Sequence, residues 1–479
     1  MLPNSHSVKV FAACLFLLVI PAADALAQKA WTLQQCIDHA LQNNLNIRQS
    51  DLSTMQSEVE INRSKAGFYP SLNGSTSYQY NFGRSLDPTS YQFTTQEIRS
   101  ANISLNGNVP LFNGFQLQNS LRQSKLEYLA SQHDLKKIQN DVSLNVVSAY
   151  LQVLYAKEQL KVTSARLNES TQQRDRTKKM VDAGVMTQGN LLDAESQLTN
   201  EELNQITAEN QLSIAKLTLL QLLELDTISN FDIEDPLVQS PEMTTLAQTP
   251  FEIYALSLTT LPEIKSADTR ILSAEKNLAA TKGNFYPRLS LFGGLNSGYS
   301  SARETVTGTN YVGLFPTAAV TQSGEAVLSP VFFTNTERTN FRDQMDQNFS
   351  KNFGLSLNIP IFNGLNTYSN VRQSRLSLEN ARITSELTRN QLFKSIQQAH
   401  TDAIAAQRKL AATEKAVVAL QEAYMYAEKR FNAGLSNSLE FLTATNNLTR
   451  ARIDSLQARY DLIFKVKVLD FYAGRPLAF

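Results

Sequence analysis

NVPLFNG, at residues 108–114, returns as NIPIFNG at residues 358–364, a spacing of 250 positions. An Arg-Gln-Ser triplet follows eight residues after each copy, so the register extends beyond the phrase itself. Upstream, FYP at residues 68–70 matches FYP at residues 285–287 with a spacing of 217. The chain is therefore predicted to consist of two structural repeats, with 33 extra residues between the two phrases of the second repeat.

Between FYP and PLFNG, apolar and polar side chains alternate with a period of two, as in strands that have one apolar face. The four segments with this pattern begin at Leu72, Ala101, Leu289 and Phe353, and the last continues to Ile361. Each is about ten residues long with aromatic side chains toward its ends, which is typical of tilted strands that cross a bilayer. A soluble β-sandwich with the same alternation is the alternative interpretation.

Four membrane strands require more than one chain. A sheet in a membrane must close, because an open edge would leave backbone donors and acceptors unpaired in hydrocarbon. The smallest spanning barrels need about eight strands, so two or more copies of this chain would have to share one barrel.

After each PLFNG-type phrase, the apolar period changes to that of a helix. No glycine or proline occurs from Phe115 to Ala183, or from Leu365 to Ala433. At 1.5 Å per residue, each stretch predicts a helix on the order of 100 Å long. Second helices are predicted from Leu191 and from Leu439, which gives two helical hairpins with the sparse apolar seam of coiled coils. Solvated stalk helices remain an alternative.

The repeated phrase is then interpreted as a junction between strand and helix. The junction residues are Pro110, Asn113, Gly114, Pro360, Asn363 and Gly364. Each proline would stand at the end of a strand, where a missing N–H is tolerated. Each Asn-Gly pair can take the positive φ needed for a sharp turn.

Composition and the N-terminus limit the function classes. Lysine plus arginine equals aspartate plus glutamate at 44 each, which gives no electrostatic case for nucleic acid. Lys9, an apolar run and Ala25-Leu26-Ala27 have the order of a secretory signal peptide at residues 1–27. No stretch is long enough for a spanning helix. Cys14 lies inside the signal, although a lipid-anchored cysteine is an alternative there, and Cys36 is predicted to be a packed side chain.

The predicted division of the chain follows from these patterns. The first repeat occupies residues 28–225, with an opening helix, a β-hairpin at about 68–112 and a helical hairpin at 115–225. A connector occupies residues 226–250. The second repeat occupies residues 251–479, with an opening helix, a β-hairpin at about 285–362, a polar outer loop at 300–347 and a helical hairpin at 365–472.

The order of these features resembles the TolC family of outer-membrane efflux proteins. The resemblance rests on the signal peptide, on Thr32 and Gln35 opening a helix before HALQNN at 39–44, and on the doubled FYP, PLFNG-type and Ala-Gly motifs. Thr32 and Gln35 also have the spacing of a capping box. The resemblance covers essentially the whole chain after the signal.

The resemblance implies a mainly α fold with membrane β-strands. It implies a homotrimer in which four strands per chain form a shared 12-stranded β-barrel in outer-membrane lipid. It also implies a periplasmic α-barrel of long helices, docked through a periplasmic adaptor protein to an inner-membrane transporter. Cargo would leave unchanged through the duct of an efflux or type I secretion system, with the pump selecting it.

Two sets of residues near the helical tips carry the expected contacts of this family. The adaptor would contact the tips at Ala183, Gly184, Val185, Ala433, Gly434 and Leu435. The periplasmic aperture would be lined at the sixth and ninth positions after each tip glycine by Glu440, Thr443, Asn190 and Asp193. A ring of three Glu440 or three Asp193 carboxylates would attract cations. The alternative is that both are ordinary helix-start acids favoured by the helix dipole.

The sequence offers little for catalysis. Its four histidines, His6, His39, His133 and His400, are scattered and lack metal-ligand spacing. No phosphate-binding loop or nucleophile elbow occurs, so we expect no enzyme activity, no metal and no cofactor. A membrane-anchored trimeric coiled-coil adhesin is the alternative to a duct. An adhesin would have its anchor at a chain end, whereas here strand pairs lie in mid-chain with helices on both sides.

Overall fold

The computed structural model describes residues 30–86, 91, 93–94, 97–226, 231–235 and 245–475. The predicted signal peptide, with Cys14, lies outside the described residues. The chain divides into two compact units. The helical unit is the described part of residues 1–57, 127–271 and 380–479, and the sheet unit is that of residues 58–126 and 272–379. Each unit therefore takes segments from both repeats.

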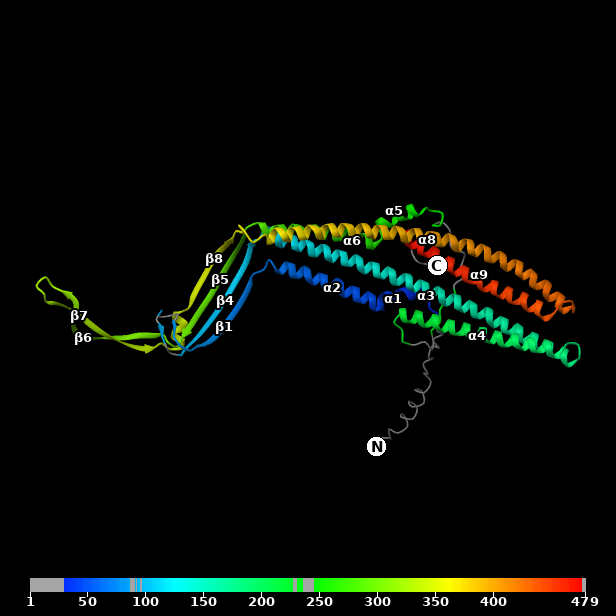
Figure 1. The fold of residues 1–479 in the computed structure, drawn as a ribbon, viewed down its shortest axis with the longest axis horizontal. Helices are drawn as coiled ribbons and strands as arrows, with labels where there is room; N and C mark the ends of the chain where they lie inside the picture. The colour runs from blue at the N-terminus through cyan, green and yellow to red at the C-terminus, as the bar shows by residue number, and fades with distance from the viewer. Residues whose placement is uncertain are drawn as a thin grey trace, which may run out of the picture. The chain divides into compact units, whose positions relative to one another are not determined.

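Each repeat contributes two shorter helices and then two longer ones (Figure 1). The first repeat contains α1 (Leu33–Asn43), α2 (Leu45–Ala66), α3 (Gln116–Asp182) and α4 (Gln188–Leu222). The second contains α5 (Pro250–Thr260), α6 (Pro262–Lys282), α8 (Asn366–Asn432) and α9 (Ser438–Tyr472). The long helices α3 and α8 have 67 residues each, and α4 and α9 have 35 each. At 1.5 Å per residue, α3 and α8 are each about 100 Å long.

The opening helix predicted for each repeat is in fact two helices. The capping box at Thr32 is confirmed, since its side chain accepts from the Gln35 N–H and the Gln35 side chain accepts from the Thr32 N–H. The helix then stops at Asn44, whose backbone is extended. In the second repeat the break falls at Leu261, because Pro262 disfavours a helical conformation in the residue before it.

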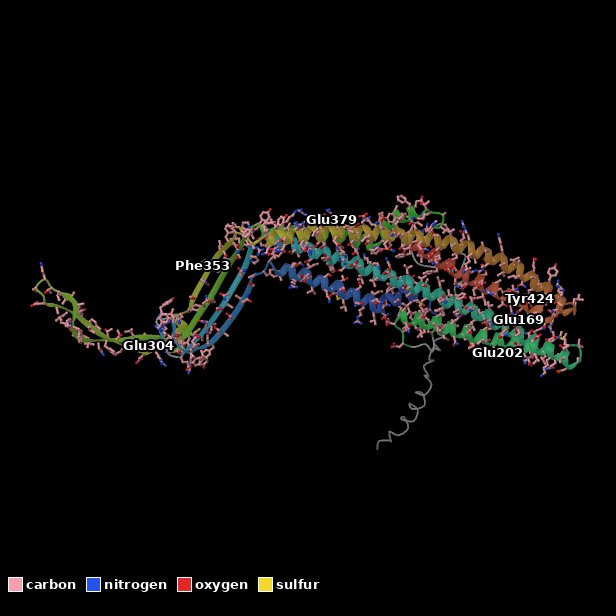
Figure 2. The ribbon with its side chains drawn as sticks, viewed as in Figure 1. Glu169, Glu202, Glu304, Phe353, Glu379 and Tyr424 are labelled. Carbon is pink, nitrogen blue, oxygen red and sulfur yellow. The ribbon has the colours of Figure 1, made fainter. Side chains whose placement is uncertain are left out.

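Four antiparallel strands form the main sheet, in the order β1-β4-β5-β8 (Figure 1). Their bounds are β1 (Ser71–Asn81), β4 (Ile98–Phe112), β5 (Arg288–Ser300) and β8 (Ser350–Asn358). Among the described residues, β1 and β8 each have a partner strand on one side only. Large apolar side chains of both outer strands are exposed, such as Leu72, Tyr78 and Leu355. Phe353 on β8, labelled in Figure 2, is exposed as well. No second sheet packs on this one within the described residues, so the β-sandwich interpretation is wrong.

The strand ends differ from the prediction at both prolines. Pro110 lies inside β4, opposite Ser290 of β5, and not at the strand's end. It is tolerated there because pairing with β1 stops at Ser71 opposite Asn108, which leaves one flank of β4 without a ladder. The last strand ends at Asn358, not at Ile361, and Pro360 therefore follows the strand.

Each junction turns through two consecutive residues with positive φ. Gly114 has φ 64° and Phe115 has φ 61°, and Gly364 and Leu365 have φ 62° and 65°. The positive φ predicted for each Asn-Gly pair is therefore confirmed at its glycine, and the asparagines do not have it. Asn113 instead caps the following helix: its side-chain Oδ1 accepts from the Leu117 N–H at 3.4 Å, and its carbonyl accepts from the Gln116 N–H at 3.3 Å.

The region predicted as a polar outer loop, residues 300–347, is regular structure. It contains the strands β6 (Glu304–Val320) and β7 (Ala326–Arg338) and the helix α7 (Phe341–Gln347). β6 and β7 pair as an antiparallel ribbon, and Gln344 of α7 anchors the end of β5 through hydrogen bonds to the backbone of Ser300. In the first repeat the described residues of the corresponding loop contain the short pair β2 (Ser85–Leu86) and β3 (Phe93–Thr94).

The helical unit has its largest core where α1 packs among α3 and α4. Cys36 is fully buried there, as predicted for a packed side chain, and burial raises the pKa of its thiol to about 12. Tyr150 of α3 is also buried, and its hydroxyl donates to the carbonyl oxygens of Trp31 and Glu234 at 3.2 and 2.8 Å. The core therefore ties the N-terminal segment to the connector.

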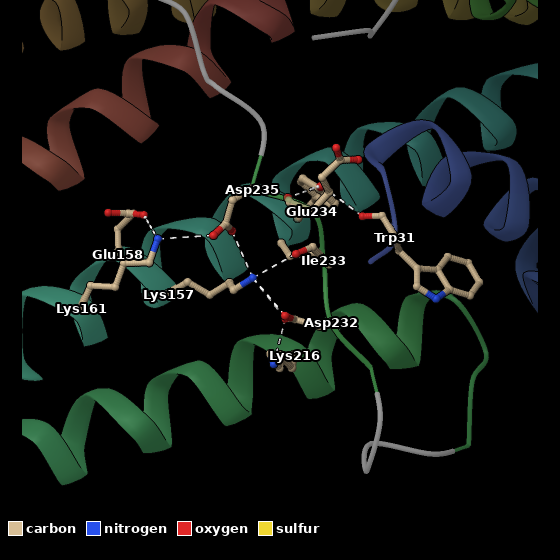
Figure 3. A network of polar contacts seen from close by, with 10 residues as sticks. Trp31, Lys157, Glu158, Lys161, Lys216, Asp232, Ile233, Glu234 and Asp235 are labelled. Carbon is tan, nitrogen blue, oxygen red and sulfur yellow. Dashed lines mark hydrogen bonds and ion pairs between the residues drawn. The ribbon is translucent and has the colours of Figure 1, made fainter. Parts of the chain in front are cut away.

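The described part of the connector, residues 231–235, is clamped to the helical unit (Figure 3). It pairs with Trp31 through two backbone hydrogen bonds of 3.0 Å. The Lys157 ammonium lies 3.2 Å from an Asp232 carboxylate oxygen and 3.1 Å from one of Asp235. Burial raises the pKa of the Asp232 carboxyl, but Lys216 and Lys157 together outweigh it and hold that pKa below its usual range.

Candidate functional site

The tips of the two helical hairpins have the same backbone geometry. Gly184 and Gly434 follow the ends of α3 and α8 with φ 73° and 70°. At the first tip, the Gly184 N–H donates to the Val181 carbonyl and the Val185 N–H to the Met180 carbonyl. At the second, Gly434 and Leu435 repeat both bonds, so each tip is a Schellman motif.

Each tip presents an apolar side chain to solvent. Val185 is 74% exposed and Leu435 is 72% exposed in the single chain. A methyl group added at Gly184 or at Gly434 would meet no heavy atom within 4 Å. Both tips are thus open surfaces with a fixed backbone, which is suited to contact with another protein.

Behind the tips, a cavity of about 160 Å³ lies within the helical unit, where the two hairpins meet. Glu169 on α3 and Tyr424 on α8 line it (Figure 2). An aromatic cluster forms one wall: the rings of Phe431 and Phe441 stack at 5.0 Å, and Tyr424 lies 5.9 Å from Phe441. Burial raises the pKa of the Tyr424 hydroxyl above its usual value.

Two polar contacts join α4 to α9 beside this cavity. The Ser438 hydroxyl donates to Asp193 Oδ2 at 3.0 Å. One to two turns further on, the side chain of Gln197 donates to Asn446 Oδ1 at 3.3 Å. These contacts connect the first helical hairpin to the second at their tip end.

The four predicted aperture residues divide into two pairs. Asn190 and Asp193 line the cavity, whereas Glu440 and Thr443 do not. Thr443 donates its hydroxyl to the Leu439 carbonyl of its own helix at 2.8 Å. The structure therefore brings only two of the four together.

The two acidic candidates also differ in charge environment. Glu440 accepts from the Arg430 guanidinium at 2.7 Å and from the Ser436 hydroxyl at 2.6 Å, so its charge is neutralised within its own hairpin. Asp193 is exposed and makes no ion pair with any residue that the structure describes. Of the two, Asp193 is the carboxylate with an uncompensated charge.

A buried ion pair near the tips escaped the sequence analysis. Arg166 of α3 lies 3.7 Å from Glu201 of α4, and these side chains are only 11% and 4% exposed. Gln197 and Asn204 donate to the Glu201 carboxylate at 2.6 and 3.1 Å. In the sequence, Glu201 is visible only as an acidic residue among the apolar positions of α4. From the sequence alone, such a residue cannot be distinguished from an ordinary solvent-exposed charge.

The comparisons with known proteins decide the family. The model of the family described as "Outer membrane efflux protein" matches residues 36–224 and 253–475, which is one segment in each repeat. The chain belongs to this family. Its members are channels of the outer membrane, so the protein is an efflux duct and not an enzyme, and the adhesin interpretation is wrong.

Individual relatives agree over nearly the full length. The chain is 23% identical to "Outer membrane efflux protein BepC" of Brucella suis, over 93% of this chain and 86% of that protein. It is also 23% identical to "Toxin and drug export protein A" of Aggregatibacter actinomycetemcomitans, over 90% and 83%. The crystal structure of the Campylobacter jejuni CmeC outer membrane channel matches with a TM-score of 0.73 at 16% identity, covering 92% of this chain and 85% of that one.

These matches fix the location of the protein in the outer membrane. In the described part of the chain, no helix is both long enough and apolar enough to span a membrane. The fold is mainly helical with a sheet portion and an internal repeat, as predicted.

Proposed function

We propose that the protein works as a homotrimer that forms the exit duct of a tripartite efflux or type I secretion system. A periplasmic adaptor would contact its helical tips, and an inner-membrane transporter would supply the cargo. The observation that supports a barrel shared between copies is the pair of sheet edges at β1 and β8, which have no partner strand among the described residues and which membrane hydrocarbon does not tolerate.

The internal repeat supplies the register with which these edges would meet. Within the first hairpin Ser71 faces Asn108, and within the second Arg288 faces Asn358. Adding 217 to Ser71 gives Arg288, and adding 250 to Asn108 gives Asn358, so the two hairpins pair in the same register. We therefore expect the pairing of β4 with β5 inside one chain to be repeated by the pairing of β8 of one copy with β1 of the next.

Leu105 of β4 faces Leu295 of β5 inside the chain. Adding 250 to Leu105 gives Leu355 of β8, and subtracting 217 from Leu295 gives Tyr78 of β1. Leu355 should then face Tyr78 of the partner subunit. Both side chains are exposed in the single chain, at 64% and 57%. Three such contacts would close twelve strands into one barrel.

Cysteine cross-linking tests this register. The variant with Tyr78→Cys and Leu355→Cys should form a covalent trimer on oxidation, because facing residues bring their Cβ atoms to about 4.5–5.5 Å. The matched control keeps Tyr78→Cys and moves the second cysteine to Ser356, whose side chain points to the other face. Light scattering of the detergent-extracted protein, corrected for bound detergent, should give the mass of three copies. A monomer, or equal cross-linking of both variants, would overturn the proposal.

We further propose that the tips dock the adaptor and that Asp193 contributes a ring of three carboxylates at the periplasmic aperture. The exposed Val185 and Leu435 and the fixed Schellman turns support the docking role. The absence of an ion pair at Asp193 among the described residues supports its role in the ring. Glu440 would contribute less, because Arg430 pairs with it.

Single-channel recording tests whether Asp193 or Glu440 sets the ion selectivity of the duct. Asp193→Asn should lower the preference of the duct for cations, because the ring would lose three negative charges at a narrow opening. Glu440→Gln should change selectivity much less. The measurement is the reversal potential in a salt gradient across a planar bilayer. The assignment of Asp193 fails if only Glu440→Gln shifts the reversal potential.

A further inference from the structure

The ribbon of β6 and β7 is an apolar structure with no described partner. Between Thr305 and Thr336 it carries a single charged residue, Glu325, in its turn. Eleven of its large hydrophobic side chains are between 40% and 67% exposed. An isolated two-stranded ribbon is at best marginally stable in water, so this one needs a surface to pack on.

Both faces of the ribbon carry large apolar side chains, and on the second face Asn310 and Ser329 lie opposite Phe333 and Phe315. The pairing of Tyr311 with Phe332 and of Leu314 with Pro330 places these side chains on one face, with ring centroids of the first pair 5.7 Å apart. The other face carries side chains from the alternate positions of the strands, including Phe315, Val331 and Phe333. A ribbon that covered one patch of its own protein would need only one such face.

The backbone of the ribbon disfavours two ways of shielding its apolar side chains: contact with lipid, and the addition of a strand from another chain. Lipid would leave the outer edges of both strands with unpaired N–H and C=O groups in hydrocarbon. Strand addition by another chain is hindered because Pro316 in β6 and Pro330 in β7 remain within the ladder. Their missing donors therefore fall on the outer edges, where an added strand would need them. The remaining possibility is that the ribbon packs against another protein surface through the side chains of its two faces.

We propose that the ribbons of three copies pack on one another, with the Tyr311 face of each against the Phe333 face of the next. This inference rests on the proposed trimer. A threefold ring joins two different patches, so it explains why both faces carry large apolar side chains. Because all three ribbons are tethered to one barrel, each meets the others at a high effective concentration. The exposed apolar side chains are divided between the two faces, so each copy would present apolar surface to both of its neighbours.

The ribbons would thus form an apolar collar joined to the outer ends of β5 and β8. Arg303 and α7 fix its base: the Arg303 carbonyl accepts from the Thr339 N–H at 3.0 Å, and the Arg303 side chain donates to Gln347 at 3.0 Å. Glu304, labelled in Figure 2, begins the ribbon there. Its carboxylate accepts from the Thr336 hydroxyl at 2.6 Å. The charges are therefore confined to the base and the turn.

A double-cysteine variant tests the collar in the full-length protein. Tyr311→Cys with Phe333→Cys places one thiol on each face, so a short bismaleimide should link all three copies into a covalent trimer. The matched control is Tyr311→Cys with Phe332→Cys, which places both thiols on one face and should cross-link within the chain. The native Cys36 is fully buried and should not react.

The outcomes separate the collar from the trimer itself. The Tyr78→Cys, Leu355→Cys variant, prepared in parallel, reports whether the barrel contains three copies. If that variant gives covalent trimers and the ribbon pair gives none, the collar is wrong and the proposed duct stands. Cross-linking of the ribbon pair to a different protein would also overturn the collar. If neither pair gives trimers, the proposed assembly itself fails.

Discussion

Replacing Gly114 with alanine should reduce the amount of assembled protein in the outer membrane several-fold. Two effects act together at this junction. Gly114 has φ 64°, a left-handed conformation that costs a residue with a Cβ about 1–2 kcal/mol. The new methyl group would also lie 2.8 Å from Tyr286 Cβ and still closer to the Gly283 carbonyl oxygen, and such overpacking costs about 1–3 kcal/mol more. The measurements are the amount of outer-membrane protein and the thermal midpoint of the extracted protein.

Gly184→Ala is the matched control for the conformational effect. Gly184 has φ 73°, but no heavy atom lies within 4 Å of an added methyl group. This variant should therefore show only the smaller, conformational loss of stability. Equal losses for Gly114→Ala and Gly184→Ala would mean that close packing at the junction contributes nothing.

Gly364 links this prediction to the trimer. In the single chain, the nearest atom to an added methyl group at Gly364 is Asn366 Nδ2, at 4.0 Å. The spacing of 217 relates Gly283 and Tyr286 to positions 66 and 69. In the proposed trimer, Gly364 would therefore lie beside Ala66 of the partner subunit, whose methyl group keeps the two backbones further apart than those of Gly114 and Gly283. Gly364→Ala should then lose more stability than Gly184→Ala, whereas in a monomer the two variants should lose the same amount.

The repeat and the strand alternation made most of this fold predictable. Gly114 and Gly364 have the positive φ expected of them, because a sharp turn from strand to helix leaves a strong local signal. The sequence does not indicate the positive φ of the next residue, Phe115 or Leu365, because the preceding turn imposes that conformation. The ribbon was missed because threonine, serine and glycine in its sequence are also typical of loops.

The candidate site at the helical tips could likewise be predicted only in part from the sequence. The resemblance predicted Glu440 and Asp193 as aperture residues from their positions after the tip glycines, but only the folded chain brings Arg430 to Glu440 and Ser438 to Asp193. Contacts between α4 and α9 join positions about 250 residues apart, and no local pattern encodes them. Which carboxylate has a cation beside it is thus a property of the tertiary structure.

Replacing Arg166 with methionine should loosen the tip end of the first helical hairpin. The substitution keeps most of the buried volume but leaves the Glu201 carboxylate, 4% exposed, without its cation. Breaking one side of a buried ion pair costs on the order of 3–5 kcal/mol, because the remaining charge has no compensation. Hydrogen exchange should therefore become faster along α3 and α4 near the tip. Arg174→Met is the matched control, because Asp175, the partner of Arg174, is well exposed and such pairs contribute about 0–1 kcal/mol.

A second substitution distinguishes a buried charge from a simple loss of packing. Adding Glu201→Gln to Arg166→Met removes the uncompensated charge and keeps an amide oxygen that can accept from Gln197 and Asn204. Hydrogen exchange in the double variant should return most of the way toward the native rate. If the double variant exchanges as fast as Arg166→Met alone, the ion pair is not what holds α4 to α3. Because the proposed adaptor contact at Gly184 lies between these helices, binding of the adaptor should weaken in Arg166→Met and recover in the double variant.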